Sequence, residues 1–263
     1  GYHWFEDWGR DAFVSMPGLL LSRGENRAAR DVFARFASRL NAGVAPGYFS
    51  SDTGRPEYNS ADAGLWMIAA VSAYLRRTGD LDYVEKNLWR GIKETTGYCM
   101  EGTHLGIKMD TDFLLHAGMP GKPLTWMDTL LRSGKPVELQ ALWYNALRIA
   151  SELAGEFGEE EFVKLCGDAA QSAKKSFNEL FWDEEGGFCR DCLPEPGGGG
   201  AFTPNQVFTV SLPYPLLSRE RARRMLESVK DRLLTPFGLR TLAPGSPGYA
   251  GRYAGTRQER EAA

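Results

Sequence analysis

The amino-acid sequence predicts an all-α fold in which helical hairpins stand around a ring. Apolar residues recur at helical spacing along almost the whole chain. No stretch shows the sustained alternation of apolar and polar residues that a half-buried strand needs. Helices that are apolar on most faces alternate four times with helices that carry charged stripes. This is the pattern of hairpins with one helix inside a ring and one outside, and we expect the ring to be open.

The predicted helices follow from local signals in chain order. Apolar runs begin near Asp11, after Ser60, which can cap a helix, and again after Pro136 and Pro204. The helices that begin near these four residues are rich in apolar and small residues on most faces, whereas the other four are amphipathic, with charged runs such as "EEEFVK" and "RERARRMLESVKDR". The expected helices cover 11–22, 26–41, 60–78, 81–97, 136–157, 159–182, 204–213 and 219–234.

Bulk properties exclude several classes of protein. The 263 residues can form one large domain or two small ones. A net charge of −3 gives no electrostatic footprint for nucleic acid, and no apolar run is long enough to span a bilayer. No charged-then-apolar signal segment opens the chain. The four cysteines are scattered in a large domain, which favours a reducing compartment and predicts a cytoplasmic protein.

Cys189 and Cys192 form a CxxC pattern inside "GGFCRDCLPEP". A zinc site would need two more ligands, and the histidines, His3, His104 and His116, are distant in sequence. A redox motif would stand at a strand-to-helix turn, whereas this pattern lies in a glycine-rich stretch. We therefore interpret the two cysteines as an incidental pair and expect neither a metal nor another cofactor.

The stretches that precede the four apolar helices share an unusual composition. Each combines glycine or proline with aromatic, carboxylate or amide side chains: they read "YHWFEDWGRD", "GYFSSDTGRPEYNSAD", "GKPLTWMDTLLRSGKPVE" and "GGGGAFTPNQ". In a ring, the N-termini of all inner helices open on the same face, where loops on a rigid scaffold commonly carry binding and catalytic groups. The opening "GYHWFEDWGRDAF" then forms the first wall of a pocket. We expect five residues to line one cavity: Trp8, Arg10, Asp11, Asp62 and Asp128.

The side chains in these stretches are typical of a sugar site. Aromatic faces pack on a pyranose, while fixed carboxylate, arginine and asparagine groups bind its hydroxyls. Hydrolysis of a glycosidic bond needs two carboxyl groups, one protonated and one ionised. Asp128 lies in "LTWMDT", where its Trp and Met neighbours are expected to desolvate it and raise its pKa toward the role of general acid.

Several candidates also have a purely structural alternative. Asp11 can pair with Arg10 or cap the first helix, and Asp62 stands in the first turn of a helix, where any carboxylate is favourable. Glu138 likewise follows Pro136 at a helix start. Three aromatic residues inside apolar runs are expected in the core rather than at a ligand: Trp66, Trp143 and Tyr144.

Six stretches in chain order carry a resemblance to a known family. They read "HWFEDWGRDAFVSMPGLLL", "YNSADAGLWMI", "PLTWMDT", "GKPVELQALWYNAL", "PNQVFTVSLP" and "GLRTLAPGSPGYAGRYAG", and they run from residue 1 to about 255. They resemble the successive motifs of the glucosidase domain of glycogen debranching enzymes, the amylo-alpha-1,6-glucosidase family, which is related to glucoamylase. The resemblance implies an (α/α)6 barrel, in agreement with the predicted hairpins. It also implies inverting hydrolysis of α-1,6-linked glucose at branch points of glycogen or limit dextrin.

The resemblance also assigns individual residues. By it, Trp8, Arg10 and Asp11 grip the terminal glucose, and Asp128 in "TWMD" is the general acid. Further motif positions are matched by other candidate substrate contacts, namely Asp62, Trp126, Lys135, Glu138 and Asn205. The implied partner is glycogen, limit dextrin or another α-glucan, with no nucleic acid and no membrane.

Two departures from the family pattern bear on activity. The family places other domains ahead of the first motif, and after "GRYAG" it continues toward a Ser-Glu motif whose glutamate serves as base, whereas this chain reads "YAGTRQEREAA". Glu259 and Glu261 lie in a charged tail, 256–263, and do not match that base. We expect residues 1–255 to form a partial catalytic domain, excised from a longer protein and open at about four hairpins, with the general base absent from the chain.

Two other functions are consistent with the same residues. A glucoamylase-like hydrolase that prefers α-1,4 links would use the same ring and the same sugar contacts. A chain that lacks its base could instead bind glucan and hydrolyse nothing.

Overall fold

The computed structural model describes residues 6–119, 122–127, 132–194, 200–252 and 254–256. Within these ranges the chain is mostly helical, as predicted, and each strand is only two residues long. The helices are α1 (Gly9–Leu19), α2 (Asn26–Ala37), α3 (Ala63–Thr78), α4 (Leu81–Asn87), α5 (Trp89–Glu101), α6 (Val137–Glu156), α7 (Glu160–Leu180), α8 (Phe208–Ser211) and α9 (Arg219–Leu233), with 3-10 turns η1 (Leu21–Arg23) and η3 (Pro204–Val207).

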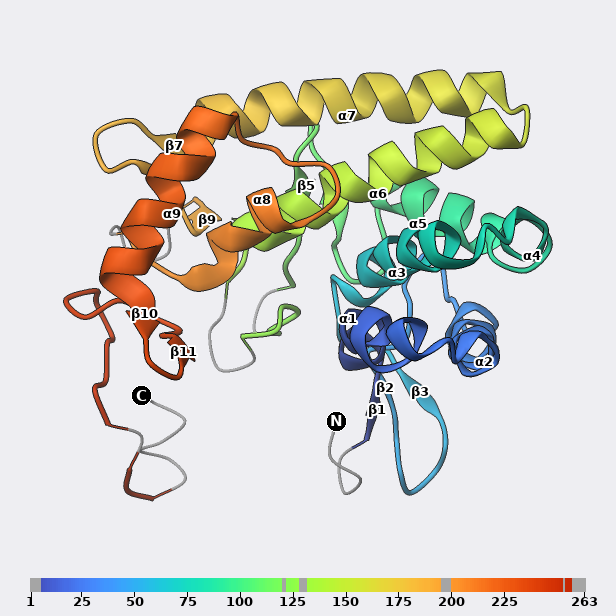
Figure 1. Cartoon of the computed structure of the whole chain (residues 1–263), viewed down its shortest axis with the longest axis horizontal. Coiled ribbons are helices and arrows are strands. Elements are labelled where there is room, and N and C mark those ends of the chain that lie inside the picture. Colours follow the sequence, from blue (N-terminus) through green and yellow to red (C-terminus); the bar gives the residue numbers. More distant parts are fainter. Residues whose placement is uncertain (1–5, 120–121, 128–131, 195–199, 253, 257–263) are drawn as a thin grey trace.

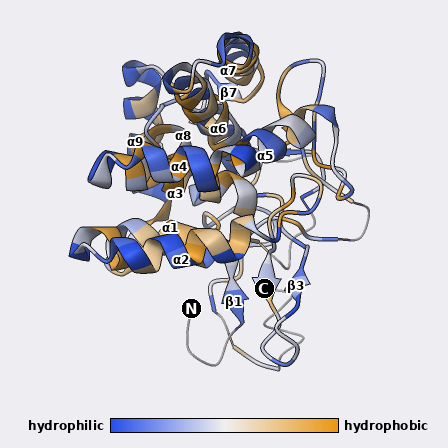
Figure 2. Cartoon of the chain, turned by 90° about the vertical axis from the view of Figure 1, so that its right-hand side faces the viewer, coloured by the Kyte–Doolittle hydropathy of each residue, from blue (hydrophilic) through white to orange (hydrophobic). Residues whose placement is uncertain are grey.

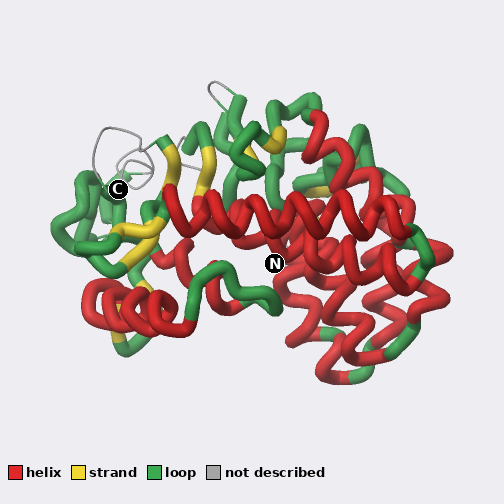
Figure 3. The backbone as a smooth tube through the Cα atoms, turned by 90° about the horizontal axis from the view of Figure 1, so that it is seen from above, coloured by secondary structure: helices red, strands yellow, loops and turns green. Residues whose placement is uncertain are grey.

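Short antiparallel strand pairs tie the loops together. The first sheet has the order β1–β2–β3 and the remaining strands form two-stranded pairs, β4–β5, β6–β9, β7–β8 and β10–β11. In Figure 3 most of the loops and strands lie along the top and left of the view, next to the helices. The strands are β1 (Asp7–Trp8), β2 (Tyr48–Phe49), β3 (Pro56–Glu57), β4 (Lys108–Met109), β5 (Leu115–His116), β6 (Lys135–Pro136), β7 (Trp182–Asp183), β8 (Phe188–Cys189), β9 (Cys192–Leu193), β10 (Leu234–Thr235) and β11 (Gly238–Leu239).

The helices pack as successive neighbours in chain order. Helix α1 contacts α3, α3 contacts α6, and α6 contacts α8, while α2, α5 and α7 pack against these from outside (Figure 1). Helix α6 is buried along almost its whole length, whereas α9 buries only one stripe. In Figure 2 the ribbon of α4 and much of α2 is blue, as expected for helices that face solvent. Two of the expected inner helices, α3 and α6, thus bury half or more of their residues, while the ring of hairpins and a six-hairpin barrel stay predictions.

Helix α1 was predicted to be an inner helix, buried on most faces, but it buries only part of its surface. Its buried residues are Gly9, Phe13 and Met16, whereas Val14 is 47% and Leu19 64% exposed. Phe13 and Met16 face the core, and Val14 and Leu19 line a cavity instead. Their apolar side chains therefore did not signal burial in the core.

Two predicted helices are interrupted. The helix expected over 81–97 is divided into α4 and α5 at Leu88, which has a non-helical φ of −120°. Leu88 and Trp89 are both buried at this break. The helix expected over 204–213 becomes the turn η3 followed by the single turn α8. It ends because Leu212 precedes Pro213 and adopts the extended conformation that a following proline favours.

The core and the cysteines complete the fold. Trp143 and Tyr144 are buried, as predicted. Cys189 and Cys192 lie in β8 and β9 with free, buried thiols, and burial raises the pKa of each to about 12. Among the described residues, no group of three or more His, Cys, Asp or Glu side chains could hold a metal ion, and no helix is long and apolar enough to cross a bilayer.

Candidate active site

One cavity of about 840 Å³ collects most of the candidate residues. It lies where α1, α3, α6 and η3 begin, which is the convergence that the lead-in stretches predict. Seven of the nine candidate residues line it: Trp8, Arg10, Asp11, Asp62, Trp126, Glu138 and Asn205. The structure therefore brings together side chains that are up to about two hundred positions apart in sequence, while their roles stay predictions.

The other two candidates are Asp128 and Lys135. Asp128 falls outside the described residues. Lys135 is not among the residues that line the cavity, because its Nζ atom lies 2.9 Å from Asp110 Oδ2 and 2.6 Å from Asp112 Oδ2. Burial alone would lower the pKa of Lys135, but these two carboxylates raise it. Contact between Lys135 and a substrate stays a prediction.

Trp8 is mounted on the small sheet that precedes α1. Its strand pairs with β2, and the Trp8 and Tyr48 rings lie 4.8 Å apart at an angle of 31°. The close approach of α1 to this sheet requires glycine at position 9. A Cβ atom there would lie 2.6 Å from the Pro46 carbonyl oxygen and 2.9 Å from the Phe36 ring.

Arg10 and Asp62 form a bidentate ion pair at the cavity wall. Arg10 Nε and Nη2 donate to Asp62 Oδ2 at 2.6 Å and Oδ1 at 2.8 Å, and Ser60 Oγ donates to Oδ1 at 2.5 Å. Asp62 is only 2% exposed and its side chain does not cap α3. The pair holds the Arg10 guanidinium in one orientation, because two parallel hydrogen bonds fix its plane.

Asp11 lies one residue beyond this pair and is exposed. Its side chain does not cap α1, and within the described part of the chain its carboxylate has no hydrogen-bond or ion-pair partner. Asp11 therefore neither pairs with Arg10 nor caps the helix, so the structure supports neither of its structural alternatives. Asp11 presents an unengaged carboxylate to the cavity.

Glu138 also lines the cavity and is held by Arg132. Arg132 Nη1 and Nη2 donate to the two Glu138 carboxylate oxygens at 2.5 and 2.7 Å, and the Arg132 side chain is fully buried. Burial raises the pKa of Glu138, and the guanidinium opposes that shift. Burial alone would lower the pKa of Arg132, but its carboxylate partners raise it.

Trp126 is oriented by Asn205. The indole Nε1–H donates to Asn205 Oδ1 at 2.9 Å, and Asn205 Nδ2 donates in turn to Asp191 Oδ1 at 2.9 Å. Asn205 is buried, and its backbone N–H donates to Thr203 Oγ1, which caps η3. This chain of hydrogen bonds fixes the orientation of the half-buried Trp126 indole. Trp126 precedes Asp128 by two residues in the sequence.

Sequence reasoning missed several residues of the site. Trp66 was expected in the core; it is half-buried and packs against the core, but it also lines the cavity and packs edge-on against Phe208, with ring centroids 5.4 Å apart. Its position four residues after Asp62 places the two on one helix face, and that signal could have found it. Arg132 lies within the third lead-in stretch, and Asp191 lies between Cys189 and Cys192. No sequence signal distinguished either residue as part of the site.

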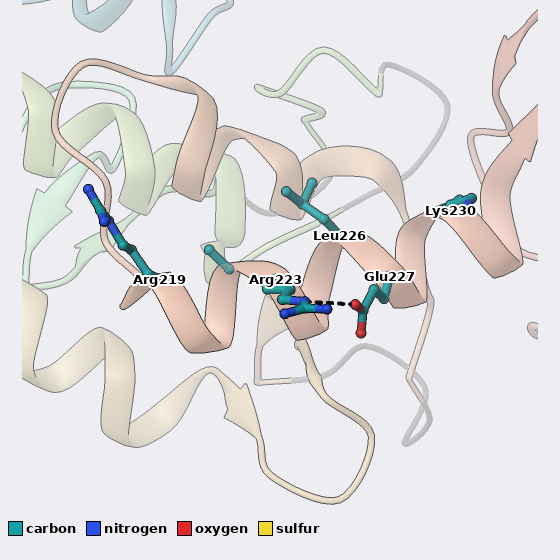
Figure 4. A pocket seen from close by; sticks show the side chains of 6 residues that line it. Arg219, Arg223, Leu226, Glu227 and Lys230 are labelled. Carbon is teal, nitrogen blue, oxygen red and sulfur yellow. Dashed lines mark hydrogen bonds and ion pairs between the residues drawn. The ribbon is translucent and has the colours of Figure 1, made fainter.

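A second hollow of about 420 Å³ lies along one face of α9 (Figure 4). It is lined by residues of that single helix, including Arg219, Leu226 and Lys230. Arg223 and Glu227 pair with each other there at 3.1 Å. Of the residues that the structure describes, none from another element lines it, so the cavity between the helix N-termini is the better candidate site.

The helical domain and its cavity of tryptophans, carboxylates, arginine and asparagine define a carbohydrate-active enzyme domain of the glycosidase type. Solved structures share the fold: a rhamnosidase from Klebsiella oxytoca with rhamnose bound has a TM-score of 0.64 and 14% identity, covering 86% of this chain and 42% of that one. The family model described as amylo-alpha-1,6-glucosidase matches residues 1–263, and the chain belongs to that family.

Curated relatives cover different parts of the chain. An N,N'-diacetylchitobiose phosphorylase of Vibrio proteolyticus is 24% identical over 194 residues, which is 70% of this chain and 24% of the relative. The glycogen debranching enzyme of Saccharomyces cerevisiae is 39% identical over 69 residues, 26% of this chain and 4% of that protein. The chain thus spans about a quarter or less of the length of these relatives.

Proposed function

We propose that the chain is part of the catalytic domain of a glycoside hydrolase that releases α-1,6-linked glucose at branch points of glycogen or limit dextrin, with inversion. The observation that carries the proposal is the single cavity lined by seven of the candidate residues. Three indoles, those of Trp8, Trp66 and Trp126, offer apolar faces to a pyranose. Arg10 and Asp11 offer donors and acceptors for its hydroxyls, while Asn205 holds the Trp126 indole in place.

Asp128 is the proposed general acid, which protonates the leaving glycosidic oxygen. An inverting enzyme also needs a base that activates water on the opposite face of the sugar. Asp62 and Glu138 are poor choices for that base, because each is bound through both oxygens to a guanidinium. We therefore assign Asp62 and Glu138 to substrate binding and to positioning.

Attack by water is better supported than attack by phosphate. A phosphorylase must hold an inorganic phosphate beside the sugar, and cationic groups are the usual means. Among the described residues that line the cavity, Arg10 is the one cation, and Asp62 already binds it. Lys135 is likewise bound by two carboxylates.

The experiment compares a branched limit dextrin with maltose, each with and without inorganic phosphate. We expect β-glucose from the branched dextrin, no dependence on phosphate, and loss of glucose release in Asp128→Asn. Preference for maltose would favour an α-1,4 hydrolase, and a sugar phosphate product would favour phosphorolysis. Binding of dextrin without any Asp128-dependent release of glucose would favour a glucan-binding chain.

A further inference from the structure

Asp191 does not line the cavity, yet its carboxylate contacts two residues that hold cavity side chains. It stands between β8 and β9 and is 7% exposed. Its two carboxylate oxygens point to different partners, one to Arg132 and the other to Asn205. Asp191 thus links Glu138, through Arg132, to Trp126, through Asn205.

The first oxygen acts on Glu138 through Arg132. Asp191 Oδ2 lies 2.9 Å from Arg132 Nε as an ion pair, although that N–H is not aligned as a hydrogen bond. The remaining guanidinium nitrogens bind both oxygens of Glu138. Because the guanidinium is planar and rigid, the position of Asp191 constrains the direction in which Arg132 holds Glu138.

The second oxygen acts on Trp126 through Asn205. Asp191 Oδ1 accepts hydrogen bonds from Asn205 Nδ2 and from Thr203 Oγ1. These bonds decide which end of the Asn205 amide is the acceptor, so that its oxygen faces the Trp126 indole N–H at 2.9 Å. A carboxylate at position 191 therefore selects the amide orientation that Trp126 needs.

The backbone of Asp191 is itself anchored. Its carbonyl oxygen accepts from Val137 N at 2.9 Å, at the first residue of α6, and from Arg132 Nη2 at 3.1 Å. Cys192 continues in register with Pro136 in the β6–β9 pair. The carboxylate is thus carried on a segment fixed to the start of the most buried helix.

We infer that Asp191 is a positioning residue that holds the cavity residues Trp126 and Glu138 in a fixed relation to each other and so sets how tightly a glucosyl unit binds. The part about the glucosyl unit rests on the proposed function. The positioning role itself does not, because it concerns contacts among the protein's own side chains. Two separate measurements can therefore test the two statements.

The first measurement follows the indole N–H signal of Trp126 in ¹⁵N-labelled full chain without sugar, assigned by its disappearance in Trp126→Phe. We expect Asp191→Ala to move this signal upfield and broaden it, because Asn205 loses its anchor. Asp191→Asn should restore it toward the wild-type position, because an amide oxygen still accepts from Asn205 and Thr203. Should the alanine variant fail to fold, Asp191→Ser is expected to show the same upfield shift.

Asp183→Ala is the matched control. Asp183 lies in the neighbouring strand β7 and its carboxylate accepts from the backbone N–H of Gly186 at 2.7 Å. Its removal should leave the Trp126 signal in place. The inference is overturned if Asp191→Ala or Asp191→Ser leaves the signal at its wild-type position, or if Asp183→Ala moves it equally.

The second measurement titrates isomaltose, an α-1,6-linked glucose disaccharide, into the same samples. Loss of one charge-assisted contact should weaken binding to Asp191→Ala by about tenfold, with a smaller loss in Asp191→Asn. Equal affinity in wild type and Asp191→Ala would overturn the effect on sugar binding. If the wild-type chain does not bind isomaltose but the Asp191 variants show the expected Trp126 shifts, the positioning role is supported and the proposed function is contradicted.

Discussion

At the scale of single residues, the Arg10–Asp62 pair makes a sharp prediction. The Asp62 side chain is nearly inaccessible, so Arg10→Met should leave an uncompensated buried carboxylate and cost about 3 kcal/mol of unfolding free energy. The double variant Arg10→Met/Asp62→Asn should lose less than the single one, because no unpaired charge is left. Urea unfolding measures both. A double variant less stable than Arg10→Met would show that the charge is not the cause.

The sequence predicted a site residue where its side-chain type is unusual for its position in the chain, and failed to predict it where the side-chain type is ordinary. The aromatic and charged opening around Trp8 pointed to the cavity because exposed termini gain nothing from indoles. Trp66 looked like any tryptophan in an apolar helix. Arg132 and Asp191 contribute through contacts between segments distant in sequence, and no local pattern encodes such contacts.

At the scale of elements, the start of α1 depends on one glycine. Gly9→Ala should cost about 1–3 kcal/mol, because the new methyl group would overlap backbone at Pro46 and the Phe36 ring. Displacement of α1 from β2 should also weaken sugar binding through Trp8. Gly18→Ala, in the same helix with open space around the added carbon, should instead stabilise the chain by about 0.5–1 kcal/mol. Thermal unfolding of the two variants measures the contrast.

Asp80 immediately precedes helix α4, and its carboxylate caps the helix. Asp80 Oδ1 accepts from Tyr83 N at 3.2 Å, while Oδ2 accepts from Tyr74 Oη at 2.7 Å and pairs with Arg30. The Tyr74 hydrogen bond contributes most to holding the pKa of Asp80 below its ordinary value. Asp80→Ala should cost about 1 kcal/mol near neutral pH.

The pH dependence of that loss has a definite sign. Because the folded pKa of Asp80 is lowered, its contribution is fully present above the unfolded pKa of about 4 and is lost as the pH falls through the folded value. The difference in unfolding free energy between wild type and Asp80→Ala should therefore shrink below about pH 4. Asp82→Ala removes an exposed i,i+4 pair with Lys86 and should change stability by less than about 0.5 kcal/mol.

At the scale of the whole molecule, the helices that were predicted correctly are those in which the apolar spacing repeats over several turns. The breaks at Leu88 and Leu212 depend on which neighbours are buried and on a following proline. The convergence of the lead-in stretches was predictable because it follows from the alternation of inner and outer helices. The exposure of Val14 and Leu19 was not, since apolar side chains that line a cavity and those that fill a core look alike in sequence.

The last prediction concerns the rate at which this chain hydrolyses branched dextrin. Of the described carboxylates that line the cavity, Asp62 and Glu138 are each bound through both oxygens to a guanidinium, and Asp11 is exposed and unengaged. A base is worth about 10²–10⁴-fold in rate. If Asp11 only binds the terminal glucose, the 263-residue chain should release glucose slower than an ordinary glycosidase by about that factor. Asp11→Asn should then raise KM with little change in kcat.

Turnover at ordinary enzyme rates, around 10 s⁻¹, would contradict this prediction. One of the chain's own carboxylates would then have to activate the attacking water. Asp11 is the one described cavity carboxylate free to accept its proton, so Asp11→Asn should in that case abolish kcat with KM nearly unchanged. Asp62→Asn should not reproduce that pattern, because the Asp62 oxygens are already occupied by Arg10 and Ser60. Steady-state kinetics on the two variants, with glucose release as readout, separates a binding Asp11 from a catalytic one.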